Sequence, residues 1–96
     1  MIRILFGIMY KIILSKQAKK DAKFIKASNL ENKVQKMLDD IELDPYSPNH
    51  NYEALKYNLS GMHSRRINYK HRLVYEINEK KLEIIIHRMW SHYENI

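Results

Sequence analysis

The spacing of the apolar residues changes at Tyr52, near the middle of the chain. Before Tyr52 the apolar residues recur at helical spacing, which is typical of helices that bury one face. The clearest such stripe consists of Leu30, Val34, Met37, Leu38 and Ile41. After Tyr52, short runs with a period of two, rich in β-branched and aromatic residues, alternate with turn residues. Helices followed by a series of strands predict an α+β fold.

Two helices are predicted before this change. Ser15 can cap a helix that runs to about Lys26, because its hydroxyl can accept from a free amide of the first turn. Ser28–Glu31 (SNLE) has the pattern of a capping box and predicts the start of the second helix. The pair 44–45 (Asp-Pro) ends that helix, since proline lacks an amide donor and restricts the residue before it. The short link at 27–28 makes the two helices a hairpin.

The first helix carries lysines along the face opposite its apolar residues. These are Lys16, Lys19, Lys20, Lys23 and Lys26. Such a stripe is typical of a solvated helix face, and it can also follow a phosphate backbone electrostatically.

The strands are predicted from β-prone runs separated by turns. The predicted strands are Tyr10–Leu14, Glu53–Tyr57, Met62–Asn68, His71–Glu76 and Leu82–Arg88. The predicted turns are Asn58–Gly61, in which Gly61 can take a positive φ, Asn68–Lys70 and Asn78–Lys81. We interpret the order as β-α-α-β-β-β, a mostly antiparallel sheet with an N-terminal helical hairpin packed on one side. Its length makes residues 1–96 a single domain.

The chain has 17 lysines and arginines against 11 acidic residues, a net charge of +6. This surplus favours polyanionic partners, although solubility alone would also account for it. The absence of cysteine excludes a disulfide scaffold and a thiol nucleophile, and it fits a cytoplasmic location. The apolar run 1–14 is too short to span a membrane and has no cleavage site after it. Met9 is a plausible start, which would make 1–8 an N-terminal extension.

No metal or cofactor is expected. The five histidines show no close metal-ligand spacing, and no glycine-rich loop could cradle a phosphate. The histidines are His50, His63, His71, His87 and His92.

The basic second half is more informative. Arg65 and Arg66 precede Arg72 across one tight turn, so Arg66 and Arg72 can share an anion on neighbouring strands. Alternatively, one of these arginines pairs with Glu76 or Glu83 across the sheet.

Two further residues could transfer protons. Glu53, three residues before Lys56, could accept a proton from a ribose 2′-hydroxyl, or it could be an ordinary surface glutamate. His92 could protonate a leaving 5′-oxygen near neutral pH, although a histidine near a chain end usually has no function.

An ordered series of motifs resembles the YoeB/Txe group of the RelE toxin superfamily. The motifs are Glu53-x-Leu55-Lys56, Asn58–Gly61 (NLSG), Ser64–Ile67 (SRRI), His71–Tyr75 (HRLVY) and the closing His92-Tyr93. The resemblance spans about Tyr10 to Tyr93 and implies a RelE-like fold. It also implies a type II toxin that cleaves mRNA in the ribosomal A site without metal and is neutralised by an antitoxin protein.

Position by position, the resemblance implies the following roles. Glu53 matches the general base, Arg72 the arginine that stabilises the phosphate, His92 the general acid and Tyr93 the tyrosine beside it. Lys56, Arg65 and Arg66 match substrate-binding cations. The implied reaction is attack of the 2′-hydroxyl on the adjacent phosphate, which leaves a 2′,3′-cyclic phosphate and a 5′-hydroxyl. The expected partners are the cognate antitoxin, the ribosome and mRNA, with operator DNA reached through the antitoxin complex; a homodimer is allowed and no membrane is involved.

The tail departs from the family pattern. Two residues, Trp90 and Ser91, stand between Arg88-Met89 and His92-Tyr93. Two extra residues preserve strand parity, so a bulge or a longer strand would keep His92 facing the site. His87 is the competing candidate for the acid.

Two other classes of function remain open. A non-catalytic toxin of the same fold that inhibits another target, as in the gyrase-poisoning branch, would not need Glu53, Arg72 and His92. A DNA-binding module is disfavoured, since no helix-turn-helix is visible and the second helix ends in acidic residues.

Overall fold

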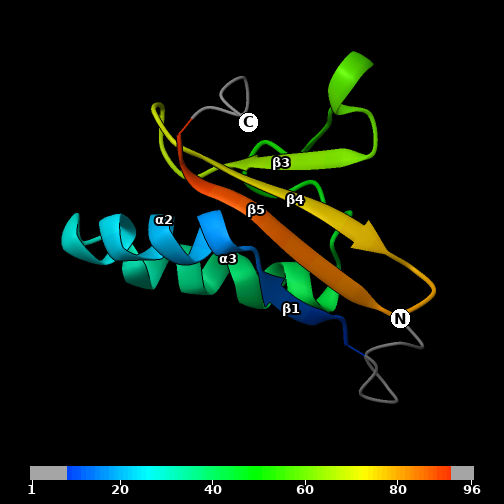
Figure 1. Ribbon diagram of the computed structural model, residues 1–96, viewed down its shortest axis with the longest axis horizontal. Coiled ribbons are helices and arrows are strands. Elements are labelled where there is room, and N and C mark those ends of the chain that lie inside the picture. Colours follow the sequence, from blue (N-terminus) through cyan, green and yellow to red (C-terminus); the bar gives the residue numbers. More distant parts are fainter. Residues whose placement is uncertain (1–8, 92–96) are drawn as a thin grey trace.

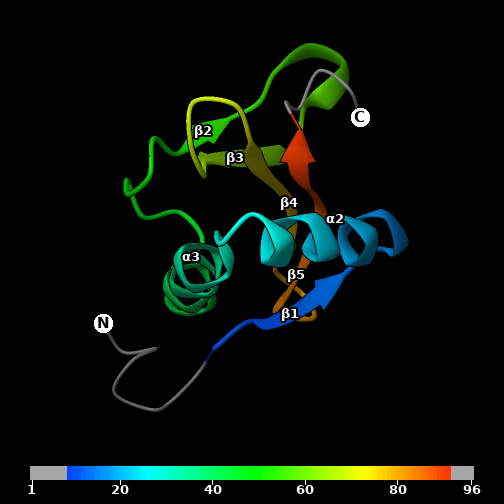
Figure 2. The ribbon, with the colours of Figure 1, turned by 90° about the vertical axis from the view of Figure 1, so that its left-hand side faces the viewer.

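Residues 9–91 form a five-stranded sheet with two helices on one side (Figures 1 and 2). The computed structural model describes residues 9–91, with the backbone alone for Ser91. In chain order the elements are β1 (Lys11–Leu14), α2 (Lys16–Ala27), α3 (Glu31–Leu43), β2 (Glu53–Ala54), a 3₁₀ turn (Tyr57–Leu59), β3 (Met62–Arg66), β4 (Arg72–Asn78) and β5 (Glu83–Ser91). The α+β prediction is confirmed, and each of the five predicted strand segments contains a strand. The order β-α-α-β-β-β counted only four strands, because it left out the short segment at Glu53 that becomes β2.

The strands lie side by side in the order β1-β5-β4-β3-β2. Neighbouring strands are antiparallel except β1 and β5, which are parallel and lie side by side although both helices and three strands separate them in the chain. The core lies between the sheet and the helices. It is built from the apolar faces of α2 and α3 and from alternate residues of the strands, among them Ile25, Met37, Ile41, Leu73 and Ile84.

The start of α2 follows the sequence prediction. The Ser15 hydroxyl accepts from the Ala18 amide at 3.0 Å and caps the helix.

The predicted capping box of the second helix is wrong. The Ser28 hydroxyl instead donates to the Ile25 carbonyl, and Leu30 stands at the N-cap of α3 without a side-chain bond. Asn29 has a φ of 63°, and the Leu30 amide donates to Ile25 O at 3.1 Å. This left-handed closing turn ends α2, so Ser28 serves the end of the first helix rather than the start of the second.

A buried carboxylate, Asp21, ties α2 to β5. It is 1% exposed and accepts from Arg88 Nε and from the Met89 amide, each at 2.9 Å. Burial alone would raise the pKa of Asp21, but the bonds from Met89, Gln17 and Arg88 outweigh it and lower that pKa. The ion pair therefore fixes the last part of β5 on the helical layer.

The predicted strand Glu53–Tyr57 is shorter than expected. It pairs with β3 at Glu53 and Ala54, and the chain then enters the 3₁₀ turn with Tyr57 at a φ of 58°. Gly61, with a φ of 94°, closes this turn as predicted.

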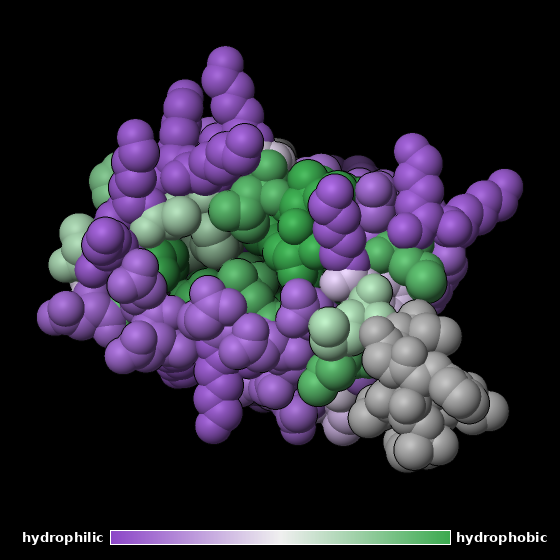
Figure 3. Space-filling view, turned by 90° about the horizontal axis from the view of Figure 1, so that it is seen from below, coloured by the Kyte–Doolittle hydropathy of each residue, from purple (hydrophilic) through white to green (hydrophobic). Residues whose placement is uncertain are grey.

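The outer edge of β1 borders a groove against α3. Ile12, Leu14 and Leu38 form its apolar part, and Gln35, Asp39 and Glu42 its polar part. Seen from below, apolar side chains lie in a hollow surrounded by polar ones (Figure 3). Among residues 9–91, no helix has the length and apolar character needed to cross a membrane.

Candidate functional site

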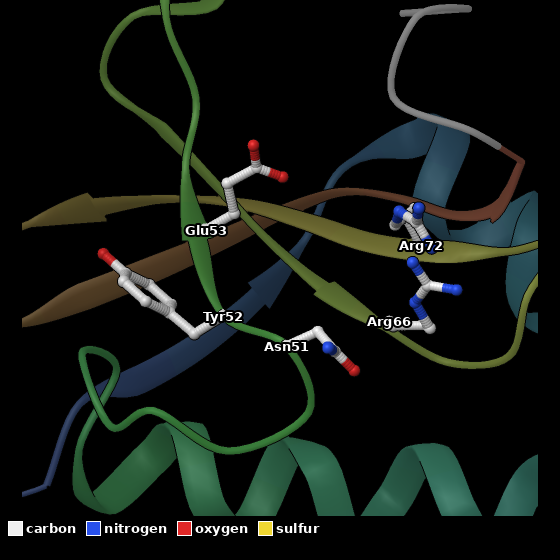
Figure 4. Close-up of a pocket in the computed structure, with 5 residues that line it drawn as sticks. All are labelled: Asn51, Tyr52, Glu53, Arg66 and Arg72. Atoms are coloured by element: carbon white, nitrogen blue, oxygen red, sulfur yellow. The ribbon is translucent and has the colours of Figure 1, made fainter.

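A polar pocket of about 300 Å³ lies where β2, β3 and β4 come together. Its lining consists of Asn51, Tyr52, Glu53, Arg66 and Arg72. Figure 4 shows the guanidinium groups of Arg66 and Arg72 close to each other, with the carboxylate of Glu53 across the pocket from them. Three of the residues predicted to do chemistry thus meet in one place.

Arg66 and Arg72 are directly opposite each other in the β3–β4 ladder. Like charges in this position repel each other, so the pair costs free energy unless an anion lies between them. Neither guanidinium forms an ion pair with a carboxylate of residues 9–91, and the alternative pairing with Glu76 or Glu83 is not observed there. In the same part of the chain, Arg72 Nη1 is buried without a hydrogen-bond partner. A buried donor of this kind is costly to leave unpaired, so the pair is suited to bind an oxyanion.

Glu53 reaches the pocket from β2, where it pairs with Ser64 of β3. Its side chain is exposed, so it is accessible to a substrate. A carboxylate within the same pocket as two guanidinium groups can accept a proton close to an anion that they stabilise.

Arg65 does not lie at the pocket, and its predicted role as a substrate contact is wrong. Strand alternation turns it to the opposite face from Arg66, where its side chain is 0% exposed. Its Nε donates to the Tyr75 hydroxyl at 2.9 Å, Nη1 to Asn49 O at 2.8 Å and Nη2 to Pro45 O at 3.0 Å. Arg65 is therefore part of the folded core.

Lys56 and His87 are not among the residues that line the pocket. Lys56 is exposed at the start of the 3₁₀ turn. His87, on β5, has its Nε2 atom 2.9 Å from Oε1 of Glu76 on the neighbouring strand β4.

The end of β5 carries two extra residues. Tyr75 pairs with Ile86, whereas Arg72 pairs with Ser91, so β5 advances five residues while β4 advances three. Register shifts on either side of Val74 accommodate the difference. His92 and Tyr93, like residues 1–8, lie outside the described residues.

Sequence reasoning missed Asn51 and Tyr52 at the pocket. Both come from the end of an irregular loop, where no periodicity indicates the direction of a side chain. Their position next to Glu53 in the sequence is the one signal that could have placed them at the pocket. Within residues 9–91, no three metal-ligating side chains gather in one place.

Comparison with known proteins identifies the family. The model of the YoeB-like toxins of bacterial type II toxin–antitoxin systems matches residues 14–93. This chain belongs to that family. The YoeB toxin of Synechocystis sp. is 43% identical over 74 residues, which cover 77% of each chain. The resemblance inferred from the motifs is thereby confirmed.

Solved structures of YoeB-type toxins share the fold. A YoeB/ParE toxin from Agrobacterium tumefaciens matches with a TM-score of 0.80 over 86% of this chain and 99% of that one, and at 22% identity it shows the fold alone. A heterotetrameric YoeB–YefM toxin–antitoxin complex from Staphylococcus aureus matches with a TM-score of 0.75 and 33% identity, over 88% of this chain and 98% of that one.

Proposed function

We propose that this YoeB-family chain is an endoribonuclease that cleaves mRNA in the ribosomal A site. The observation that carries the proposal is the facing pair Arg66 and Arg72, unpaired by any carboxylate of residues 9–91, in one pocket with Glu53. A scissile phosphate between the guanidinium groups would relieve their repulsion and gain charge-assisted hydrogen bonds. The bonds would strengthen as the phosphate acquires charge in the transition state.

In this reaction Glu53 removes the proton from the ribose 2′-hydroxyl, whose oxygen attacks the adjacent phosphorus. The bond from phosphorus to the 5′-oxygen breaks, and His92 protonates the leaving oxygen, with Tyr93 beside it. The products are a 2′,3′-cyclic phosphate and a 5′-hydroxyl. No metal ion takes part, because protonated and cationic side chains supply the charge stabilisation.

The end of β5 supports His92 as the acid rather than His87. Ser91, one residue before His92, is paired with Arg72, so the described chain ends beside the phosphate-binding arginine. His87 instead lies against Glu76.

The proposed partners follow from the charge of the chain and from its relatives. The net charge of +6 favours binding to ribosomal RNA and mRNA, and to an acidic antitoxin. The relative from Staphylococcus aureus, solved in complex with YefM, supports neutralisation by an antitoxin. Lys56 is proposed as a cation that contacts the substrate once the ribosome is bound.

Primer extension on translated mRNA after induction tests the proposal. We expect cuts within codons of ribosome-bound mRNA that disappear when translation is blocked. Cleavage of free RNA at an equal rate would contradict ribosome dependence. Rescue of a phosphorothioate substrate by a thiophilic cation would contradict a reaction without metal.

A non-catalytic toxin of the same fold remains the second candidate. It would inhibit growth without new RNA ends, and Glu53→Gln would leave that inhibition intact.

A further inference from the structure

The segment 45–52, here called the pocket loop, leads from α3 into β2 and delivers three pocket residues. Asn51 and Tyr52 lie at its end, and Glu53 follows at once. Whatever holds this loop therefore determines where the Glu53 carboxylate lies relative to Arg66 and Arg72.

The conformation of the pocket loop is costly. His50 and Asn51, consecutive residues with side chains, have φ values of 58° and 55°. L-residues other than glycine rarely adopt this left-handed region, so surrounding contacts must maintain it.

The buried guanidinium of Arg65 supplies part of these contacts, and the Arg66 amide supplies another by donating to His50 O at 2.7 Å. Two of its nitrogens donate to the loop carbonyls of Asn49 and Pro45, and the third donates to the Tyr75 hydroxyl. That hydroxyl donates in turn to Pro45 O at 2.7 Å. Burial raises the pKa of Tyr75 to about 12, so the phenol keeps the proton that it donates.

The last residue of the loop is held from the same side. The Arg65 guanidinium lies over the Tyr52 ring, 5.1 Å from its centroid, at a distance typical of a cation–π contact. The Tyr52 hydroxyl lies 2.7 Å from His63 Nδ1, and the two rings stack.

A buried arginine needs hydrogen-bond partners in any core. The alternative is therefore that the bonds of Arg65 serve only the stability of the fold. No carboxylate of residues 9–91 pairs with Arg65, although an ion pair would compensate its burial most directly. Its hydrogen bonds to main-chain atoms all go to the pocket loop. These bonds therefore hold the pocket loop against β3 while they compensate the buried guanidinium.

We propose that Arg65, together with Tyr75, is a positioning residue that sets the distance between Glu53 and the arginine pair. The proposal rests on the proposed function, in which Glu53 is the base. Arg65 touches no substrate and acts through the loop. A small displacement of a catalytic group lowers the chemical rate more than it lowers binding.

Tyr75→Phe is the central test, because it removes one hydroxyl and leaves the ring. We expect kcat on ribosome-bound mRNA to fall about tenfold while KM stays within about twofold. Arg65→Lys should also have a lower kcat than the wild type, since one ammonium group cannot reproduce the three hydrogen bonds of the planar guanidinium. Ser15→Ala, which removes the cap of α2 far from the pocket, is the control for lost stability.

Two kinetic results would overturn the proposal. One is wild-type kcat in Tyr75→Phe and Arg65→Lys at a temperature where both are folded. The other is a raised KM with unchanged kcat, which would indicate a substrate contact instead. Ser15→Ala must lower the melting temperature without lowering kcat.

Amide hydrogen exchange separates this proposal from the proposed function. We expect the Arg66 amide, which donates to His50 O of the pocket loop at 2.7 Å, to exchange at least about tenfold faster in Tyr75→Phe than in the wild type, whatever the activity. If the wild type cleaves no mRNA, the proposed function fails while this result still supports Arg65 as the anchor of the loop. Equal exchange rates would refute the anchor even in an active enzyme.

Discussion

The two faces of the sheet use neighbouring arginines in different ways. On the face covered by the helices and the pocket loop, Arg65 is fully buried and each of its three nitrogens donates a hydrogen bond. On the opposite face, Arg66 and Arg72 stand opposite each other without an ion pair among residues 9–91. The first arrangement stabilises the fold, whereas the second keeps donors available for an anion.

The difference shows that residue type alone does not identify a binding residue. Arg65 and Arg66 are adjacent, and strand alternation sends one to each face. Substitutions of the two should therefore affect different properties of the protein.

The largest expected effect is a loss of activity on the face that carries Arg66 and Arg72. Glu53→Gln removes the proposed base and keeps the size of the side chain, so cleavage of ribosome-bound mRNA should fall about 10²- to 10⁴-fold. Single-turnover cleavage measures the loss, and thermal unfolding should show that the variant folds normally, because Glu53 is exposed. Unchanged cleavage would remove Glu53 from the mechanism.

Arg72→Ala should lower the same rate about 10²- to 10³-fold, since it removes a donor to the phosphate in the transition state. Its removal also ends the repulsion with Arg66, so the melting temperature should not fall as it does for a core substitution. Lys23→Ala, on the exposed face of α2, is the matched control for a lost positive charge.

Arg65→Met and Arg66→Met compare the two faces directly. The Arg65 variant leaves the Asn49 carbonyl without its donor and the Pro45 carbonyl with the Tyr75 hydroxyl alone, and it should lose roughly 3 kcal/mol of unfolding free energy. The Arg66 variant should change it by less than about 0.5 kcal/mol, because the side chain is exposed and faces a like charge. Denaturant titration measures both, and similar losses would show that the faces do not differ in this way.

Local patterns predicted much of this arrangement. The Ser15 cap and the end of α3 before Asp44-Pro45 follow from short-range chemistry, and the structure confirms both. The opposition of Arg66 and Arg72 also followed, because a six-residue separation across a tight turn leaves few registers.

Features that depend on distant partners could not be predicted in the same way. Nothing in the sequence around Arg65 indicates that the carbonyls of Pro45 and Asn49 will meet it, since that requires the path of the pocket loop. The Ser28 hydroxyl could bond either at the start of α3 or at the end of α2. The left-handed turn at Asn29 places it at the end of α2. Asp21 likewise has no local signal of its role, because its partners Arg88 and the Met89 amide lie on the distant strand β5.

The smallest expected effect is a pH dependence of stability that arises on the covered face. Burial, together with the charge of Arg65, lowers the pKa of His63 below its usual value near 6.5. Burial likewise lowers the pKa of His71, which stacks on Trp90 at 4.0 Å, and Lys70 adds to this effect while the Trp90 carbonyl opposes it.

Both histidines are therefore neutral in the fold at pH values where the unfolded chain already binds protons. Their contribution to stability is complete above about pH 6.5 and is lost as the pH falls from there toward the lowered values. Each can contribute at most about 1.4 kcal/mol per pH unit to the slope of the unfolding free energy. Denaturant titrations between pH 7 and pH 5 should show this decline, and His63→Phe, which keeps a ring in the stack, should flatten it. An equal slope in that variant would mean that the covered face does not hold His63 in its neutral form.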